Sequence, residues 1–266
     1  MSFLTTPAGV RLRYTDRGSG SHTIVLVHGW KGSHRMWDPA VYRLMREFRV
    51  IAFDNRGMGE SDKPSGPYDF SVLADDLAFV LEALSASEVT LVGWSMGCSI
   101  SLEYLARGGG AAAKLALMNG PLKLTRTLEF PWTMSDEQLH GYLDDLAANW
   151  PDAERTFSRG ALRDPSSAYA DLHYQVALQT PLEMATRIVE EQIRLDHIPV
   201  LPTLRIPVLA LYGRHDPYYP VALAEYIAEH TPNGSHVIFE DSAHAPHYEE
   251  PDRFCEVIGA FARTSG

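Results

Sequence analysis

Cysteine is scarce in this chain, which has only two, Cys98 and Cys255, among 266 residues. Two cysteines cannot build a disulfide framework, and neither lies in a pattern that supports metal binding. Cys98 falls in a helical pattern, where a free cysteine usually acts as a small buried hydrophobic residue. We therefore expect neither a disulfide scaffold nor a bound metal.

Long apolar runs and positive charge are also scarce. No apolar stretch approaches the roughly 18 residues that a membrane span needs, and the first residues lack the basic segment and apolar run of a secretory signal. With 23 Lys and Arg against 34 Asp and Glu, the formal net charge is −11, and such a surface opposes nucleic acid. We expect a cytoplasmic protein that binds neither membrane nor nucleic acid, with its oligomeric state open.

Short apolar runs alternate with helical patterns along most of the chain. Amphipathic segments at 70–84, 221–230 and 251–261 are long enough to cross back over a sheet, and 10–14 is typical of an antiparallel edge strand. The apolar runs predict parallel strands at 23–28, 49–54, 89–93, 115–119, 208–213 and 236–241. The pattern therefore predicts an α/β fold with an open, doubly wound, mostly parallel sheet.

The pattern changes between Pro121 and about Leu204. No strand-like run occurs there, and helical spacing dominates 135–150, 166–178 and 181–195. We expect a helical insertion over 121–204 in a core domain made of 1–120 and 205–266. It would cover the carboxyl ends of the strands as a lid, and the alternative is a helical subdomain packed away from that edge.

The most informative segment is VTLVGWSMG, in which an apolar, β-branched run leads into Gly-x-Ser-x-Gly around Ser95. Helical spacing follows it, so the strand, turn and helix that this motif requires occur in order. Gly93 and Gly97 remove side chains where strand and helix backbones come close, which lets the serine project from the sheet edge. Ser95 is therefore predicted as a nucleophile, against the alternative of an ordinary turn serine.

A serine hydroxyl becomes a good nucleophile only when a base takes its proton, so a histidine and an orienting carboxylate are expected nearby. Asp216 and His244 each follow a predicted parallel strand. Both therefore fall at the sheet edge that carries Ser95. The chain order is serine, aspartate, histidine.

Four motifs occur in order: HGW at 28–30, DNRGMGES at 54–61, the Ser95 turn, and the Asp216 and His244 loops with EEP at 249–251. Through them nearly the whole chain resembles the α/β-hydrolase fold enzymes, with a helical cap between the sixth and seventh strands. It is most similar to the esterase and cofactor-free haloperoxidase (perhydrolase) branch. The resemblance implies an oxyanion hole built from the backbone N–H groups of Trp30 and Met96. The start of a helix independently favours this role for Met96, because its N–H has no intrahelical partner.

The chain departs from the family pattern at Ala243 and at Lys31. Ala243 stands where glycine commonly precedes the catalytic histidine, which narrows that loop. Lys31 stands where perhydrolases of this branch usually carry proline, and this favours plain ester hydrolysis. Some relatives take the acid from the end of the sixth strand, but 118–121 (MNGP) has no carboxylate, which leaves Asp216 as the acid.

Other residues near these motifs receive supporting roles. His247 is the alternative candidate for the base; if it is not the base, it is expected in a loop or at the rim of the pocket. His215 is interpreted as a supporting or solvated neighbour of Asp216. His28 is predicted to be structural and to hydrogen-bond the oxyanion loop. Asp54 and Arg56 are interpreted as holding a turn near the site, or as an ordinary solvated pair.

Two tryptophans are candidates for substrate contact. Trp94 adjoins Ser95, and Trp132 lies early in the predicted insertion. Both could line an apolar pocket, although aromatic residues more often belong to the core.

The resulting hypothesis is a serine hydrolase that cleaves a small or medium apolar carboxylic ester or lactone through an acyl-enzyme on Ser95. No cofactor is implied. Two alternatives use the same triad: carbon–carbon bond hydrolysis and acyl transfer to peroxide. A fourth hypothesis is a small-ligand receptor that has kept the hydrolase fold, because a fold alone does not define an activity. A serine nucleophile in place of aspartate argues against dehalogenase and epoxide hydrolase chemistry.

Overall fold

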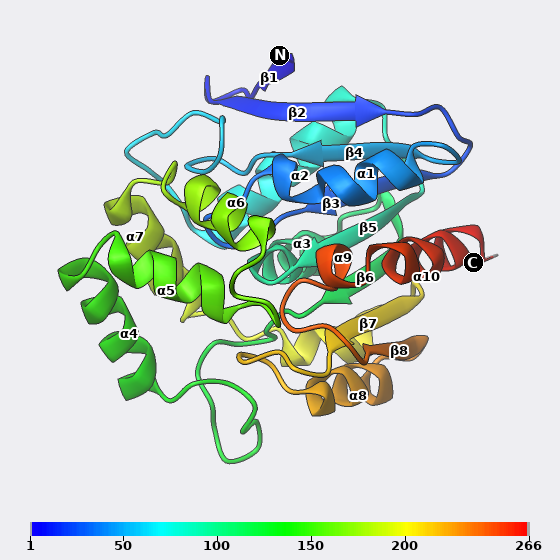
Figure 1. The fold of residues 1–266 in the computed structure, drawn as a ribbon. Coiled ribbons are helices and arrows are strands. Elements are labelled where there is room, and N and C mark those ends of the chain that lie inside the picture. Colours follow the sequence, from blue (N-terminus) through cyan, green and yellow to red (C-terminus); the bar gives the residue numbers. More distant parts are fainter. Residues whose placement is uncertain (1, 265–266) are drawn as a thin grey trace.

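The computed structural model describes residues 2–264, and one eight-stranded sheet forms its centre. The strand order is β1-β2-β4-β3-β5-β6-β7-β8, so from β3 the chain adds β4 on one side and then β5 to β8 on the other (Figure 1). The parallel strands are β3 (Thr23–Val27), β4 (Arg49–Phe53), β5 (Val89–Trp94), β6 (Ala112–Met118), β7 (Val208–Gly213) and β8 (Gly234–Phe239). This arrangement confirms the predicted doubly wound, mostly parallel sheet.

The antiparallel edge of the sheet is larger than the sequence predicted. One edge strand was expected over 10–14, but the structure has β2 at Arg11–Arg17 and a further strand, β1, at Ser2–Thr5. Thr6 N donates to Val10 O at 2.9 Å and closes a tight turn between the two strands. The turn folds Ser2–Thr5 back onto β2, a pairing that this short segment does not reveal in the sequence.

Helices cover both faces of the sheet, which is why the parallel strands are almost wholly apolar. Alternate residues of β3 point to opposite faces, so Ile24 and Leu26 belong to one apolar cluster and Val25 and Val27 to the other. The first cluster includes residues of α1 (Asp38–Leu44) and α10 (Pro251–Arg263), and the second includes residues of α2 (Phe70–Ala83), α3 (Met96–Ala106) and α8 (Val221–His230). Figure 1 shows α1 and α10 side by side on the same face of the sheet.

Four α-helices lie between β6 and β7. They are α4 (Asp136–Ala148), α5 (Asp152–Gly160), α6 (Ala168–Ala177) and α7 (Leu182–Gln192). Ser135 begins α4 with a capping box that it shares with Gln138, which satisfies N–H groups of the first turn. Figure 1 shows these helices together at one end of the sheet, the end toward which the parallel strands point. The remaining helices are short: the 3-10 helices η1 (His34–Trp37) and η2 (Ile198–Thr203), and the four-residue α9 (Pro246–Glu249).

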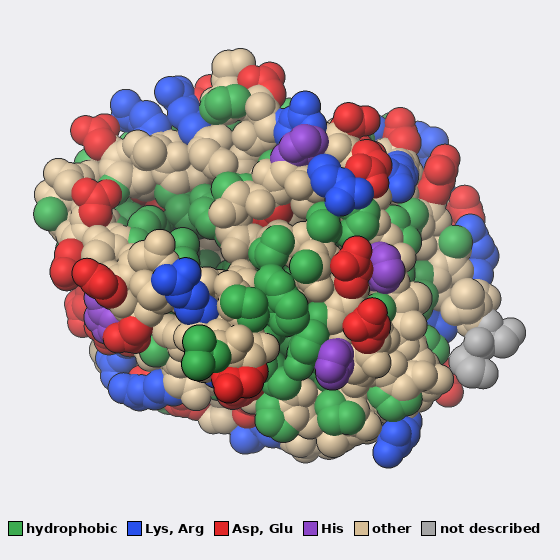
Figure 2. All heavy atoms as spheres, turned by 90° about the horizontal axis from the view of Figure 1, so that it is seen from below, with side chains coloured by type: hydrophobic (Ala, Val, Ile, Leu, Met, Phe, Trp, Pro, Cys, Tyr) green, Lys and Arg blue, Asp and Glu red, His purple; other side chains and the backbone are tan. Residues whose placement is uncertain are grey.

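The surface mixes charges of both signs. On the face in Figure 2, acidic and basic side chains are scattered, and hydrophobic side chains gather in a hollow at the left. Exposed ion pairs such as Arg214 with Glu240, 2.8 Å apart, contribute to this mixture. Within residues 2–264, no helix is both long and apolar enough to cross a bilayer.

Candidate active site

Ser95 occupies a strained turn between β5 and α3. Its φ is +54° and its ψ is −121°, values that L-residues rarely adopt. A Cβ on Gly93 would lie 2.6 Å from the carbonyl oxygen of Gly97, and a Cβ on Gly97 would collide with the backbone of β3. Both glycines are therefore required by the close approach of the strand and helix backbones. The turn leaves Ser95 only partly buried, at the edge of a cavity.

Asp216 and His244 form a hydrogen-bonded pair at the ends of β7 and β8. His244 Nδ1 lies 2.9 Å from Asp216 Oδ2, and the Asp216 side chain is inaccessible to solvent. Asp216 Oδ1 accepts from the backbone N–H groups of Tyr218, at 2.8 Å, and Tyr219, at 3.3 Å. These donors fix the carboxylate, which in turn orients the imidazole so that its other nitrogen is free for chemistry.

Asn119 also holds this pair, and the sequence did not assign it a role. Its Nδ2 donates to Asp216 Oδ2 and, at 3.1 Å, to the carbonyl of Ala243, while its Oδ1 accepts from Gly213 N at 3.3 Å. The residue follows β6 directly and has a φ of +46°. Its position at a strand end was the available signal, but an asparagine cannot serve as the acid of the site, so the sequence pattern gave it no role.

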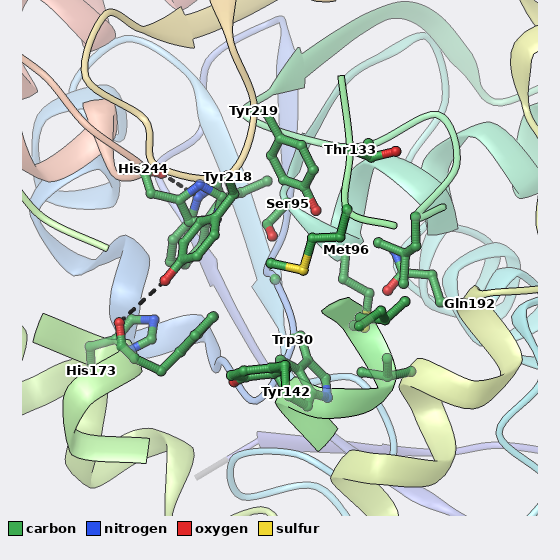
Figure 3. Close-up of a pocket in the computed structure, with 17 residues that line it drawn as sticks. Trp30, Ser95, Met96, Thr133, Tyr142, His173, Gln192, Tyr218, Tyr219 and His244 are labelled. Carbon is green, nitrogen blue, oxygen red and sulfur yellow. Dashed lines mark hydrogen bonds between the residues drawn. The ribbon is translucent and has the colours of Figure 1, made fainter. Parts of the chain in front are cut away.

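One cavity brings Ser95 and His244 together (Figure 3). In Figure 3 the two side chains border the same space, with Met96 beside them and Tyr142 and Trp30 at its far side. The other residues that line it are mostly apolar or aromatic: Gly29, Trp94, Leu124, Thr133, Met134, Leu139, Phe157, His173, Val189, Gln192, Tyr218 and Tyr219. Most of these residues belong to the segment between β6 and β7 or to the loop that carries Asp216.

The two candidate oxyanion donors come from different elements. Met96 begins α3, so its N–H is one of the first-turn groups that have no partner within the helix. Trp30 lies on the loop after β3, and its indole N–H donates to the carbonyl of Ala185 in α7 at 2.9 Å. Gly29 lets this loop approach Ser95, because a Cβ there would lie 2.9 Å from the serine Cβ.

His28 ties the Trp30 loop to the loop after β4. Its Nδ1 lies 2.7 Å from Gly29 O, and its Nε2 accepts from Asn55 N at 3.0 Å. Burial lowers the pKa of His28, which keeps the ring neutral and suits the acceptor role of Nε2. These contacts describe a structural histidine.

The remaining candidates lie away from the cavity. His247 is fully buried between the rings of Trp37 and Trp94, with centroids 4.5 Å and 4.6 Å away, and its Nε2 lies 2.6 Å from the hydroxyl of Tyr169. Burial lowers the pKa of His247 to about 3. His215 is exposed. Neither histidine lines the cavity that contains Ser95.

Trp132 lies elsewhere than predicted, and Asp54 and Arg56 follow one of their two predicted interpretations. Trp132 does not border the cavity; it packs on Phe130 and Tyr226, with ring centroids 5.1 Å and 4.8 Å away. The hypothesis that it contacts substrate is therefore corrected. Asp54 and Arg56 are both buried and are not a solvated pair: Arg56 Nε lies 2.5 Å from Asp76, and Asp54 Oδ1 lies 2.7 Å from His34 Nδ1. Asp54 Oδ2 also accepts from Glu60 N at 2.7 Å, which agrees with the predicted role in holding a turn.

A family model described as alpha/beta hydrolase fold matches residues 22–251, so the chain belongs to that family. It is 27% identical to the AB hydrolase superfamily protein YisY of Bacillus subtilis (strain 168), over 98% of this chain and 99% of that protein. It is 29% identical to the non-heme chloroperoxidase CPO-A1 of Kitasatospora aureofaciens, over 92% of each chain. Among solved structures it is similar to an esterase (EaEST) from Exiguobacterium antarcticum, with 25% identity, a TM-score of 0.94 and 99% of both chains covered. These relatives confirm the predicted resemblance to the esterase and haloperoxidase branch.

Proposed function

We propose that this protein is a serine hydrolase of small or medium carboxylic esters or lactones. The observation that carries the proposal is the Asp216–His244 hydrogen bond of 2.9 Å at the cavity that Ser95 also lines. A carboxylate, an imidazole and a serine on a strained turn are the parts that acyl transfer needs. The similarity to an esterase supports the same class of reaction.

In the proposed mechanism, Ser95 attacks the substrate carbonyl while His244 takes the serine proton. Asp216 holds the imidazole and stabilises its charged form. The N–H groups of Trp30 and Met96 stabilise the negative oxygen, and His244 then returns the proton to the leaving alcohol. Water activated by His244 releases the acid from Ser95 in the second half of the cycle.

We assign residues 121–204 as a cap over a core of 1–120 and 205–266. Cap residues such as Leu139, Tyr142 and Val189 make one side of the cavity apolar, which suits an apolar acyl or alcohol group. Trp94 borders the same cavity and contacts substrate beside Ser95 in this assignment.

The test is release of p-nitrophenol from p-nitrophenyl butyrate by the wild type and by Ser95→Ala. We expect turnover by the wild type and a loss of at least about a thousandfold in the variant. Equal rates for the two proteins would contradict the proposal. Because the chain is similar to a chloroperoxidase, acyl transfer to peroxide is the second candidate, and adding hydrogen peroxide to the same assay tests it.

A further inference from the structure

Buried polar side chains form a continuous series behind one wall of the cavity. Lys31, on the loop after β3, forms an ion pair with Glu154 Oε2 in α5, and both side chains are inaccessible to solvent. Glu154 Oε1 lies 2.8 Å from Ser158 Oγ, one turn further along α5. Ser158 Oγ lies 2.7 Å from His173 Nδ1 in α6. The series therefore runs from the loop after β3 through α5 to His173 in α6, and the proposed mechanism uses none of its members.

The positions of the protons follow from the charged end. Burial lowers the pKa of Lys31 to about 8, partly offset by Glu154, so the ammonium persists at neutral pH beside a carboxylate that can only accept. Ser158 must then donate its single hydrogen to Glu154. Its oxygen is left to accept, so His173 Nδ1 carries a hydrogen and donates it to Ser158.

The same reasoning fixes the other ring nitrogen. Burial, Lys31 and His244 together lower the pKa of His173 to about 3, so the ring is neutral and its Nε2 holds a lone pair. His173 lines the cavity, and its Nδ1 is turned toward Ser158 in the wall. Among residues 2–264, no group donates a hydrogen bond to Nε2. Figure 3 shows His173 on the side of the cavity near Tyr218.

We propose that His173 determines specificity by accepting, at Nε2, a hydrogen bond from a neutral hydroxyl group of the substrate. This inference rests on the proposed ester hydrolysis and names its substrate class: esters or lactones that carry a hydroxyl on the acyl or the alcohol part. An alkyl substrate would remove water from this buried acceptor without replacing its hydrogen bond. A neutral donor suits the site better than an ammonium, because Lys31 already supplies positive charge behind the wall.

The experiment compares matched esters by titration of the released acid. Ethyl 3-hydroxybutyrate against ethyl butyrate tests a hydroxyl on the acyl part, and 2-hydroxyethyl butyrate against propyl butyrate tests one on the alcohol part. In at least one pair we expect kcat/KM to favour the hydroxyl ester by about tenfold. His173→Phe should bring that ratio to about one. Ser158→Ala keeps the imidazole but removes its orienting partner, so the ratio should also fall.

The control variant is His140→Phe, since His140 is exposed on α4 and does not line the cavity. It should keep the wild-type ratio. Turnover of all four esters without a hydroxyl preference, or a preference that survives in His173→Phe, would overturn this inference while leaving ester hydrolysis intact. Absence of hydrolysis that depends on Ser95 for all four esters would overturn the proposed function and the inference with it.

A second measurement tests the inference without the His173→Phe variant, in case that variant does not fold. In the Ser95→Ala protein, ¹⁵N NMR of the imidazole should show His173 with its hydrogen on Nδ1. Adding the preferred hydroxyl ester should move the Nε2 resonance, whereas the matched alkyl ester should not. A resonance that responds to neither ester, or equally to both, would overturn the inference.

Discussion

The indole N–H of Trp94 donates a hydrogen bond of 2.7 Å to the backbone carbonyl of His244, 150 residues further along the chain. Trp94 directly precedes Ser95, so this contact joins the turn of the proposed nucleophile to the loop of the proposed base. Its ring also packs against the imidazole of His244, with centroids 5.7 Å apart. One buried side chain therefore helps to set the relative position of the proposed nucleophile and the proposed base.

We expect Trp94→Phe to lower kcat/KM for p-nitrophenyl butyrate by about tenfold and the free energy of unfolding by about 1–2 kcal/mol, because the carbonyl of His244 loses a buried donor. Steady-state kinetics and urea unfolding measure the two effects. Trp132→Phe is the matched control, since Trp132 lies outside the cavity lining, and its kcat/KM should stay within about twofold of wild type. Equal effects of the two substitutions would contradict this role of Trp94.

Asn119→Leu keeps the branched shape of the side chain but removes the donors to Asp216 and Ala243. We expect kcat to fall by about tenfold with little change in KM, because the aspartate that orients His244 loses a fixed partner. Kinetics with p-nitrophenyl butyrate separate the two parameters. An unchanged kcat in a folded variant would show that the backbone donors of Tyr218 and Tyr219 suffice.

Lys31→Met should destabilise the protein by about 3–5 kcal/mol, because it leaves the carboxylate of Glu154 buried and unpaired. The double variant Lys31→Met with Glu154→Leu should be more stable than the single variant, since it removes both charges. Urea unfolding at pH 7 measures both. Arg214→Ala breaks an exposed pair and should cost about 1 kcal/mol or less. A double variant no more stable than Lys31→Met would contradict this account of the pair.

Because His247 is buried, we expect the free energy of unfolding to decrease in acid. The pKa of His247 is about 3 in the folded protein and about 6.5 when unfolded, so between these values the unfolded chain binds more protons. Stability therefore falls as pH decreases from about 6.5 toward 3, and this one group contributes about 1.4 kcal/mol per pH unit. His247→Phe should reduce the loss between pH 6 and pH 5 by about 1 kcal/mol, measured by urea unfolding. An identical pH dependence in the variant and the wild type would contradict the assignment.

Local physical chemistry made much of the fold and part of the site predictable. Parallel strands buried on both faces need continuous apolar runs, so the six runs stood out from the helical patterns around them. Gly93 and Gly97 are required by a backbone approach within a few residues of Ser95, so the turn was visible in a short motif. The edge strand β1 was missed because its pairing depends on a turn and on β2, not on a pattern of its own.

The parallel strands, the strained serine turn and the chain order of serine, aspartate and histidine were all readable from the amino-acid sequence, because each depends on neighbouring residues or on strand ends. The choice of aromatic residues that border the cavity depends instead on the packing of distant elements: Trp94 borders it and Trp132 does not, although both are tryptophans. The same packing buries Lys31 against Glu154, 123 residues away. Such contacts arise when separate elements pack together and exclude water. The spacing of residues along the chain does not predict which distant elements will meet.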